Sequence, residues 1–485
     1  MSAGPTAASA PSHAALVQGS VGRTLFRTAY PLLAGTFAMN AYNLTDTWYV
    51  ARLGTRPLAA MGFTFPVVGL LTCVAMGIGA AITTLASHAM GRRAHDQASR
   101  FVTQGLAAMA AVTAVLGLAG WALMDPLFRR LGADAQTLPL VTAYMRIWFA
   151  GALFMAMPMF GNGILIAAGD SKTASGFMLL GPLLNLLLDP ILIYGWLGLP
   201  AMGIAGAALA TVVAQAAATA WLIRLLAHKH RILAWRPGWW RGMTGTFFRI
   251  GRFAVPIVLG HILMPVSASV ITRILSQFGH AAVAAAAAAQ RIEHFAFIIP
   301  MALGISLTPY MSQNFGAGRI DRVRQGFRLA SRFALLFGAG TTLLFVGAAP
   351  GIARLFTRDP AVMPIVIAYF RIVAFGYGMM EVHRYVGFVL TGLHKPASAT
   401  TLAALRVLLL LIPLSALGAR WWGTTGVFAG RLAADLFSGA IGMYWIARLL
   451  APDAVTRRWT HRLPVGPPGR TATPEQTADT RASAA

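Results

Sequence analysis

Residues 76–96 read MGIGAAITTLASHAMGRRAHD, and residues 301–321 read MALGISLTPYMSQNFGAGRID. The second segment follows the first at an offset of 225 residues, and both are apolar runs that end in a short polar loop. The positions shared at this offset are Met76, Gly79, Thr83, Ser87, Gly91 and Asp96, which match Met301, Gly304, Thr308, Ser312, Gly316 and Asp321. This repeat predicts two related halves that each contain the same helix and loop.

The composition indicates that these helices lie in a membrane. Of 485 residues, 57% are hydrophobic and only 11% are charged, whereas soluble domains contain about 25% charged residues. This excludes an ordinary soluble enzyme and a disordered chain. A spanning helix needs about 20 mostly apolar residues. Twelve such runs occur, at 25–50, 57–88, 99–124, 137–168, 173–195, 200–227, 250–277, 281–311, 329–350, 361–391, 397–418 and 423–450.

The basic residues predict the orientation. The formal net charge is +25, but the basic residues form short clusters rather than the continuous face that nucleic acid requires, so we expect no nucleic-acid partner. Connections rich in Lys and Arg stay in the cytoplasm. The richer set contains Arg92, Arg93, Arg100, Lys172, Lys229, Arg231, Arg236, Arg241, Arg319, Arg322, Arg324, Arg328 and Lys395. An even number of spans then places both termini in the cytoplasm, and we expect a bacterial inner-membrane protein.

The longest basic connection, about residues 227–249, falls at the midpoint of the twelve runs. We therefore predict an all-α membrane protein of twelve transmembrane helices. They should form two six-helix bundles related by a pseudo-two-fold axis along the membrane normal, with substrate bound between them. The expected divisions are a disordered N-terminus at 1–19, an N-lobe at 20–228, a cytoplasmic linker at 229–249, a C-lobe at 250–450 and a disordered cytoplasmic tail at 451–485.

Charged residues inside the apolar runs point to function, because a charge in a spanning helix is costly unless it faces a cavity or a partner. Asp46 lies late in the first run, and Asn43 shares its helix face three residues earlier. Pro31, in the same run, removes a backbone donor and permits a kink. The alternative is an acid at the outer membrane interface, since Arg52 follows.

Asp189 is flanked by leucines in the fifth run, and Asn185 lies one turn earlier on the same face. Apolar surroundings disfavour a charged carboxylate, and a nearby Asp46 would do so further. The pair is therefore predicted to hold a proton near neutral pH and to release it on exposure to water. The alternative is an acid tied to a neighbouring Arg. The offset of 225 matches Asp46 to Ile271, and the offset of 223 that holds later in the half matches Asp189 to Ile412. The second half therefore lacks both acids, which favours a dedicated site in the first half.

The second half has a different polar set. It consists of Arg291, Glu293, His294, Glu381, His383, Arg384, Arg406, Arg431 and Asp435. These residues form either internal ion pairs or, for Glu293 and Glu381, ligands of a cationic substrate. We find no motif of a protease, hydrolase, nucleotide site or metal site. We therefore expect a protein that is not an enzyme, holds no metal, and draws its energy from an ion gradient or from the substrate's own gradient.

Several short motifs follow one another along residues 20–450. They are Pro31-Leu32, Tyr42 to Asp46, Leu58-Ala59-Ala60 with Gly62, Met76 to Gly79, Asn162 with Ala168-Gly169-Asp170, Asn185 with Asp189-Pro190, Gly203 to Thr211, and Gln313 to Gly318 with Asp321-Arg322. In this order they make the chain similar to the MATE (multidrug and toxic compound extrusion) transporters, and to their DinF-like branch in particular. The major facilitator superfamily fits poorly, because its characteristic loop after the second helix is not matched at residues 91–97.

The resemblance implies the export of amphipathic, often cationic, compounds in exchange for H⁺ or Na⁺. It implies no cofactor, and we expect a monomer in contact with membrane lipid. The resemblance implies a role in proton coupling for Asp46, Asn185, Asp189 and Thr211. It also implies that α-helical bending at Pro31 acts as a gate. Candidate residues of the substrate cavity are Tyr42, Asn43, Asn162, Glu293 and Glu381.

Departures from the family pattern bear on the coupling ion. Met264, near His261, stands where the NorM-like branch has an acid in helix 7, Glu381 matches the helix 10 acid to within one residue, and Ile166 replaces a common Arg. These differences disfavour sodium coupling through the second half. One other hypothesis is a flippase for a lipid-linked precursor, which would favour a more cationic cavity than the first-half acids allow. Another is a non-transporting scaffold, in which isolated buried acids would be costly.

Overall fold

The computed structural model describes residues 15–233, 235, 237–357 and 359–451, without the side chains of residues 43, 44 and 356. Its compact units are Met1–Met443 and Tyr444–Ala485. The terminal segments 1–14 and 452–485, for which the sequence predicts disorder, lie outside the described residues.

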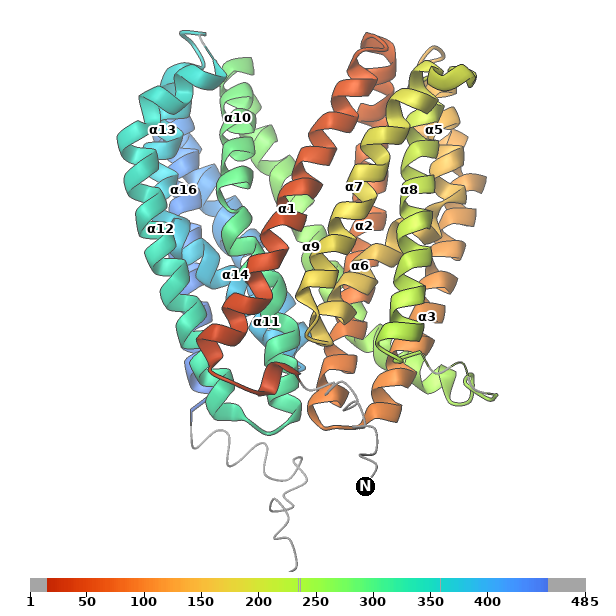
Figure 1. Ribbon diagram of the computed structural model, residues 1–485. Coiled ribbons are helices and arrows are strands. Elements are labelled where there is room, and N and C mark those ends of the chain that lie inside the picture. Colours follow the sequence, from red (N-terminus) through yellow and green to blue (C-terminus); the bar gives the residue numbers. More distant parts are fainter. Residues whose placement is uncertain (1–14, 234, 236, 358, 452–485) are drawn as a thin grey trace, which may run out of the picture. The chain divides into compact units, whose positions relative to one another are not determined.

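Each half of the chain forms one six-helix bundle (Figure 1). The first contains α1 (Val21–Ala51), α2 (Thr55–Gly91), α3 (His95–Ala122), α4 (Met124–Arg130), α5 (Leu138–Ala150), α6 (Ala152–Ala167), α7 (Ser171–Tyr194), the 3-10 turn η2 (Trp196–Gly198), α8 (Ile204–Arg224) and the π-helical turn η3 (Leu225–Lys229). The second contains α9 (Met243–Ser276), α10 (His280–Ala296), α11 (Ile298–Gly316), α12 (Ile320–Phe356), α13 (Met363–Val373), η4 (Ala374–Gly376), α14 (Tyr377–Gly392), α15 (Pro396–Ala404), η5 (Leu405–Leu411) and α16 (Ile412–Leu449). The exact lobe boundaries stay a prediction.

Twelve spans can be followed through these helices. Eight helical stretches are long and apolar enough on their own to cross a membrane, and the bent pairs α5–α6 and α10–α11 raise that number to ten. The 31-residue α1 is less apolar than these stretches but is long enough to be a further span. The stretch Pro396–Leu449 contains two spans, because the backbone leaves helical geometry at Trp422 and Gly423. The φ of Gly423 is +60°, a conformation that favours glycine. The predicted twelve-helix architecture is therefore confirmed.

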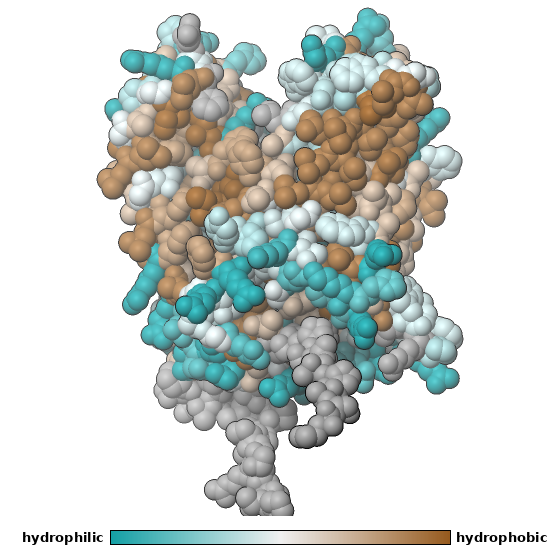
Figure 2. Space-filling view, in the orientation of Figure 1, coloured by the Kyte–Doolittle hydropathy of each residue, from teal (hydrophilic) through white to brown (hydrophobic). Residues whose placement is uncertain are grey.

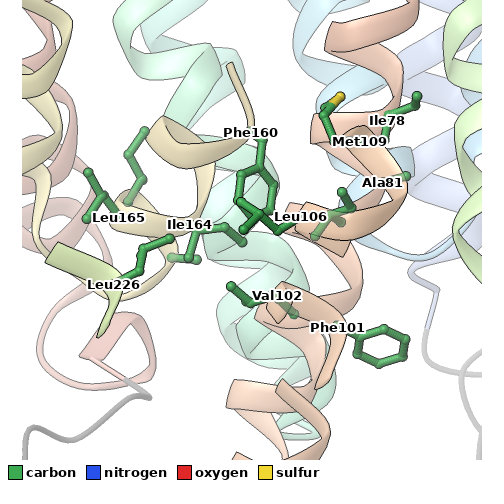
Figure 3. Close-up of a cluster of buried hydrophobic side chains, with 14 of the residues drawn as sticks. Ile78, Ala81, Phe101, Val102, Leu106, Met109, Phe160, Ile164, Leu165 and Leu226 are labelled. Carbon is green, nitrogen blue, oxygen red and sulfur yellow. The ribbon is translucent and has the colours of Figure 1, made fainter. Parts of the chain in front are cut away.

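The two bundles share a hydrophobic core at one end only. One cluster of buried side chains draws on α2, α3, α6, α7 and α8 of the first bundle, and Ile257 of α9 and Ala302 of α11 continue it into the second. Figure 3 shows part of this cluster, where Phe160 and Ile164 of α6 lie beside Leu106 of α3. The basic connections at 92–94, 230–233, 237–242 and 317–319 lie at this end of the helices, which we call the basic end.

Toward the opposite end each bundle has its own core. The cluster of the first bundle includes Val50, Met61, Phe128, Val141, Trp148 and Ile204, and that of the second includes Leu275, Ala285, Phe345, Phe370, Tyr377 and Phe428. Figure 1 shows the bundles diverging toward this end, and Figure 2 shows the surface hollowed between them. Apolar burial thus joins the bundles at the basic end and leaves a cleft between them at the opposite end.

Two glycines allow the bundles to touch at the basic end. A Cβ atom on Gly91 of α2 would lie 2.1 Å from the carbonyl oxygen of Gln313. A Cβ atom on Gly316 of α11 would lie 2.3 Å from the carbonyl oxygen of His88. These glycines occupy equivalent positions in the sequence repeat. The approach of the two backbones therefore requires glycine in both halves.

Side chains at equivalent positions of the repeat also cross between the bundles. Gln313 of the second bundle donates a hydrogen bond from Nε2 to the carbonyl oxygen of Ala167 in the first. His88, the first-bundle counterpart of Gln313, lies with its ring centroid 4.2 Å from that of His394 in the second. Each bundle thus places the side chain from the end of its second span against the other bundle.

Part of the segment expected to be disordered is bound to this interface. Residues Ala15–Val17 form a 3-10 turn, and Leu16 is buried. The backbone nitrogen of Leu16 donates to Oε1 of Gln313 at 3.2 Å, and Nδ2 of Asn314 donates to the carbonyl oxygen of Leu16 at 3.2 Å. Arg322 donates from Nη1 to the carbonyl oxygen of Gly19 at 2.6 Å. Composition does not reveal these contacts, because each depends on the second bundle.

Asp170 caps α7 at the basic end. Its Oδ1 accepts from the backbone nitrogen of Thr173 at 3.1 Å, and its Oδ2 accepts from Nζ of Lys229 at 2.6 Å. Partial burial raises the pKa of Asp170, but the hydrogen bonds from Lys229 and Thr173 together lower it by more, so the pKa lies below its ordinary value. Asp170 therefore stabilises the fold mainly as a carboxylate.

Asp170→Asn should lower the midpoint of thermal unfolding by about 1 °C at neutral pH, since a partly exposed ion pair contributes little. The folded-state pKa is depressed, so the stabilisation is present above the unfolded-state pKa, about 3.9. It is lost as the pH falls through the folded-state pKa. Melting curves of both proteins in detergent at neutral and acid pH test this. A difference in midpoint that does not shrink with acidification would contradict it.

Candidate functional site

Asp189 is completely buried in α7 and lies among polar side chains. When the Asn185 amide is placed with its nitrogen toward the carboxylate, Nδ2 donates to Oδ2 of Asp189 at 2.6 Å. In the same placement Oδ1 of Asn185 accepts from Oγ1 of Thr211 at 3.0 Å. Among the described residues Asp189 forms no ion pair with Arg or Lys, so the arrangement differs from the alternative of an acid tied to an arginine.

Close packing of α7 and α8 supports this contact. A Cβ atom on Gly206 of α8 would lie 2.4 Å from the carbonyl oxygen of Leu192 in α7, so the two backbones nearly touch. Thr211 follows one to two turns later on α8 and meets Asn185. Tyr42 of α1 joins them, with its hydroxyl 3.3 Å from Oγ1 of Thr211. Three helices thus contribute to one hydrogen-bonded group.

The structure brings Asp46 to the same group. Asp46 lies on α1, and its buried Oδ1 has no hydrogen-bond partner in the described part of the chain. It interacts electrostatically with Asp189, and both acids also interact electrostatically with the hydroxyl groups of Tyr42 and Tyr144. Two carboxylates that interact in a poorly hydrated site repel each other, and a proton or small cation bound there would relieve that repulsion. The oxygen ligands present suit a hard cation.

No larger metal centre is present in the residues that the structure describes, since no three His, Cys, Asp or Glu side chains gather to hold a metal ion. The group formed by Asp46, Asp189, Asn185, Thr211 and Tyr42 is called the acid-pair site below.

Pro31 lies inside α1, which stays helical from Val21 to Ala51. The carbonyl oxygen of Pro31 accepts a hydrogen bond from Oγ of Ser175 in α7. The same contact recurs in the second bundle, where Oγ1 of Thr400 donates to the carbonyl oxygen of Pro256. Pro31 therefore connects α1 to the helix that carries Asp189, and a bend of α1 at this point would have to change that bond.

Two predicted cavity residues are not placed in the acid-pair site. Asn43 belongs to α1, but its side chain lies outside the described residues. Asn162 is half-buried in α6, and its Oδ1 has no hydrogen-bond partner in the part of the chain that the structure describes. The structure thus leaves both as predictions.

Tyr144 of α5 belongs near the acid pair, although the sequence analysis did not single it out. It is buried and interacts with both carboxylates. A signal existed in the repeat, since Ala143-Tyr144-Met145-Arg146-Ile147 returns at the offset of 225 as Ala368-Tyr369-Phe370-Arg371-Ile372. Its counterpart Tyr369 also lies in a polar cluster. The repeated tyrosine therefore belongs to a buried polar group in each bundle.

The polar cluster around Tyr369 centres on the carboxylate of Glu293. Oε2 of Glu293 accepts from Nη2 of Arg431 at 2.9 Å, and Oε1 accepts from the hydroxyl of Tyr377 at 2.8 Å. Arg431 also donates to the hydroxyl of Tyr369. Both oxygens of Glu293 are therefore engaged inside the second bundle.

The other acids of the second bundle also face arginines. Glu381 is completely buried, and its Oε1 lies 3.1 Å from Nη1 of Arg384. Oδ1 of Asp435 accepts from Nε and Nη2 of Arg406 at 2.9 Å and 2.6 Å. Glu293, Glu381 and Asp435 are thus each paired with an arginine of the second bundle.

Arg431→Gln should destabilise the protein by about 2 kcal/mol, because it leaves the Glu293 carboxylate without its cation. Breaking a fully buried pair costs about 3–5 kcal/mol, and the side chain of Arg431 is 18% exposed, which reduces the loss. Adding Glu293→Gln should restore part of the stability, as a double-mutant cycle would show. Thermal melts in detergent provide the measurement. Equal melting of the wild type and the single variant would argue against a stabilising pair.

Known proteins match this chain along most of its length. The model of the MatE family matches residues 31–191 and again residues 256–417. The FAD transporter of Shewanella oneidensis is 33% identical over 444 residues, which cover 91% of this chain and 98% of that protein. The multidrug export protein MepA of Staphylococcus aureus is 23% identical over 425 residues, or 85% and 90% of the two chains.

Solved structures show the same architecture. The crystal structure of the Vibrio cholerae MATE transporter VcmN in its bent form has a TM-score of 0.84 and 29% sequence identity to this chain. The similarity covers 90% of this chain and 98% of that one. The two family matches begin at Pro31 and at Pro256, the prolines that the repeat pairs.

Proposed function

The chain belongs to the MatE family of membrane transporters, and on this basis we propose that it exports amphipathic, cationic drugs or toxic metabolites in exchange for protons. The observation that supports proton exchange is the acid-pair site. Two acids of the first bundle lie together with Asn185, Thr211 and Tyr42, and Asp189 has no basic partner among the described residues. Assignment to the DinF-like branch stays a prediction.

The proposed cycle uses the cleft between the bundles. If the basic end lies in the cytoplasm, the cleft opens outward. A proton taken up there by Asp46 and Asp189 removes an acidic attraction for a cationic substrate and alters the contacts of α1. The substrate leaves, the bundles rock to open the basic end, and the proton dissociates inward. A proton drives this cycle only because it binds the two states unequally. Rearrangement at Pro31 is the proposed gate.

Protons are favoured over sodium because the second bundle offers no free acid at the expected position. Met264, which stands where the NorM-like branch has an acid, is an apolar side chain that is 70% exposed. Glu293 and Glu381 are each paired with an arginine. Sodium bound at the acid-pair site is the remaining alternative.

Transport into proteoliposomes tests this proposal directly. The purified full-length chain would be reconstituted, and uptake of ethidium would be followed by fluorescence under an imposed proton gradient or sodium gradient. We expect accumulation with the proton gradient only. Accumulation with the sodium gradient alone would identify sodium, not the proton, as the coupling ion. If neither gradient moves ethidium, the proposed antiport of cations is wrong.

A flavin dinucleotide is a second candidate substrate. The observation that favours it is the 33% identity to the FAD transporter of Shewanella oneidensis over 98% of that protein. Such a substrate carries two phosphate groups and is anionic, so it needs a cation in the cleft that the acid-pair site does not supply. A lipid-linked pyrophosphate would also need a cation in the cleft. The flippase alternative therefore depends on whether the cleft contains one.

A further inference from the structure

Arg291 differs from the arginines that pair with acids in the second bundle. Arg431, Arg406 and Arg384 each face a carboxylate. Arg291, on α10, has an exposed side chain and forms no ion pair or hydrogen bond with any residue that the structure describes. Among the described residues no carboxylate pairs with Arg291, so its guanidinium group is available to a ligand.

Arg291 lies on a different face of α10 from the side chains that pack against the rest of the bundle. The buried side chains of this helix are Ala282, Ala285, Ala286, Ala289 and Glu293, which repeat at helical spacing along one face. On the other side, His294 and Phe295 follow Arg291 by one turn, so the three side chains are neighbours. His294 is exposed and Phe295 is 45% exposed. A cation and an aromatic ring are thus presented together.

This exposed face lies within the membrane span. Arg291 is about 9 Å along the helix from the bend at Phe297 between α10 and α11. An arginine facing lipid at such a depth is costly, so a charged side chain there faces a water-filled cavity or a partner. Figure 1 shows α10 bordering the space between the bundles, with its partner α13 on the far side, and Figure 2 shows the surface hollowed there.

We infer that Arg291, with His294 and Phe295, forms a docking point for the phosphate group of an amphipathic substrate. The inference rests on the proposed transport function and specifies the class of its second candidate substrate, a compound that carries phosphate. A guanidinium group binds phosphate through two parallel hydrogen bonds, and Phe295 offers apolar contact to an attached ring. In the first bundle, Pro66 stands at the position equivalent to Arg291. The first bundle thus holds the two buried acids, whereas the second bundle holds an exposed arginine.

Binding of flavins to the full-length chain in nanodiscs tests this site. The probes are FAD, riboflavin, which has the same ring without phosphate, and ethidium. Arg291→Ala should weaken FAD binding about tenfold or more, as expected for loss of a charged hydrogen bond, and Arg291→Lys should recover part of it. Binding of riboflavin and ethidium should not change. Arg371→Ala is the control, since it removes another exposed arginine of the same bundle.

The outcomes separate the alternatives. Equal weakening of FAD and riboflavin would make Arg291 a structural residue and overturn the inference. Ethidium transport without any FAD binding would overturn it too, while leaving the proposed antiport intact. Nanodiscs with and without phosphatidylglycerol distinguish the source of the phosphate. Inhibition of FAD binding by that lipid in the wild type, but not in Arg291→Ala, would assign the site to a lipid headgroup and overturn the small-molecule assignment.

Discussion

Asp189→Asn should lower proton-driven export at least about tenfold and remove its dependence on pH. Coupling between two ligands in transport proteins is typically 1–3 kcal/mol, or about 5–150-fold, and an asparagine neither binds nor releases the coupling proton. The fold should survive, because the side-chain oxygen of the new residue still accepts the hydrogen bond from Asn185 that lies at 2.6 Å. Ethidium uptake into proteoliposomes over a range of pH is the measurement.

Asp435→Asn is the matched control for this variant. Asp435 is also a completely buried aspartate, but it belongs to the second bundle and is bound by Arg406. Its replacement should lower stability while the remaining folded protein keeps the pH dependence of transport. If Asp189→Asn and Asp46→Asn both transport fully with unchanged pH dependence, the acid pair is not the coupling site.

Gly91→Ala should prevent the bundles from closing at the basic end and thereby stop the transport cycle. The added Cβ would lie 2.1 Å from the backbone oxygen of Gln313, and a backbone atom cannot move aside as a flexible side chain does. Overpacking costs about 1–3 kcal/mol, which shifts the equilibrium away from the closed basic end by about 5–150-fold. The separate cores at the opposite end are untouched, so thermal stability should change much less than transport.

Spin labels on the two bundles at the basic end would report the change as a longer distance, alongside the loss of ethidium uptake. Gly69→Ala is the control on the same helix, because a Cβ there meets nothing within 4 Å. Unaltered transport and unaltered distances in Gly91→Ala would show that the close approach of Gly91 and Gln313 is not needed in the cycle.

The acid pair illustrates what one sequence can predict about a membrane site. Asp46 and Asp189 stand out because each interrupts an apolar run, and the cost of a charge in a membrane does not depend on knowing the fold. The repeat showed in addition that the second half lacks both acids. Tyr144 and Ser175 were missed, because a tyrosine or serine in a span is unremarkable until packing places it beside a carboxylate or a proline carbonyl.

The second bundle shows the limit of the same reasoning. Its charged residues were visible in the sequence, but the sequence left two alternatives for them, internal ion pairs or binding of a cationic substrate. The contact of 2.9 Å between Glu293 and Arg431 favours pairing, while Arg291, two residues earlier, is exposed and without a partner among the described residues. Neighbouring positions on a helix point in different directions, so the same stretch supplies one buried and one exposed charge.

The sequence by itself determined the membrane setting, the twelve spans, the two halves and the position of the two acids inside apolar runs. All of these follow from local runs of apolar residues and from a repeat that can be read along the chain. Only the tertiary structure decided which side chains meet, where the bundles separate and which arginines of the second bundle pair with an acid. Those features depend on contacts between helices far apart in the sequence, such as Tyr42 with Thr211, and on cores that join the bundles at one end but not at the other.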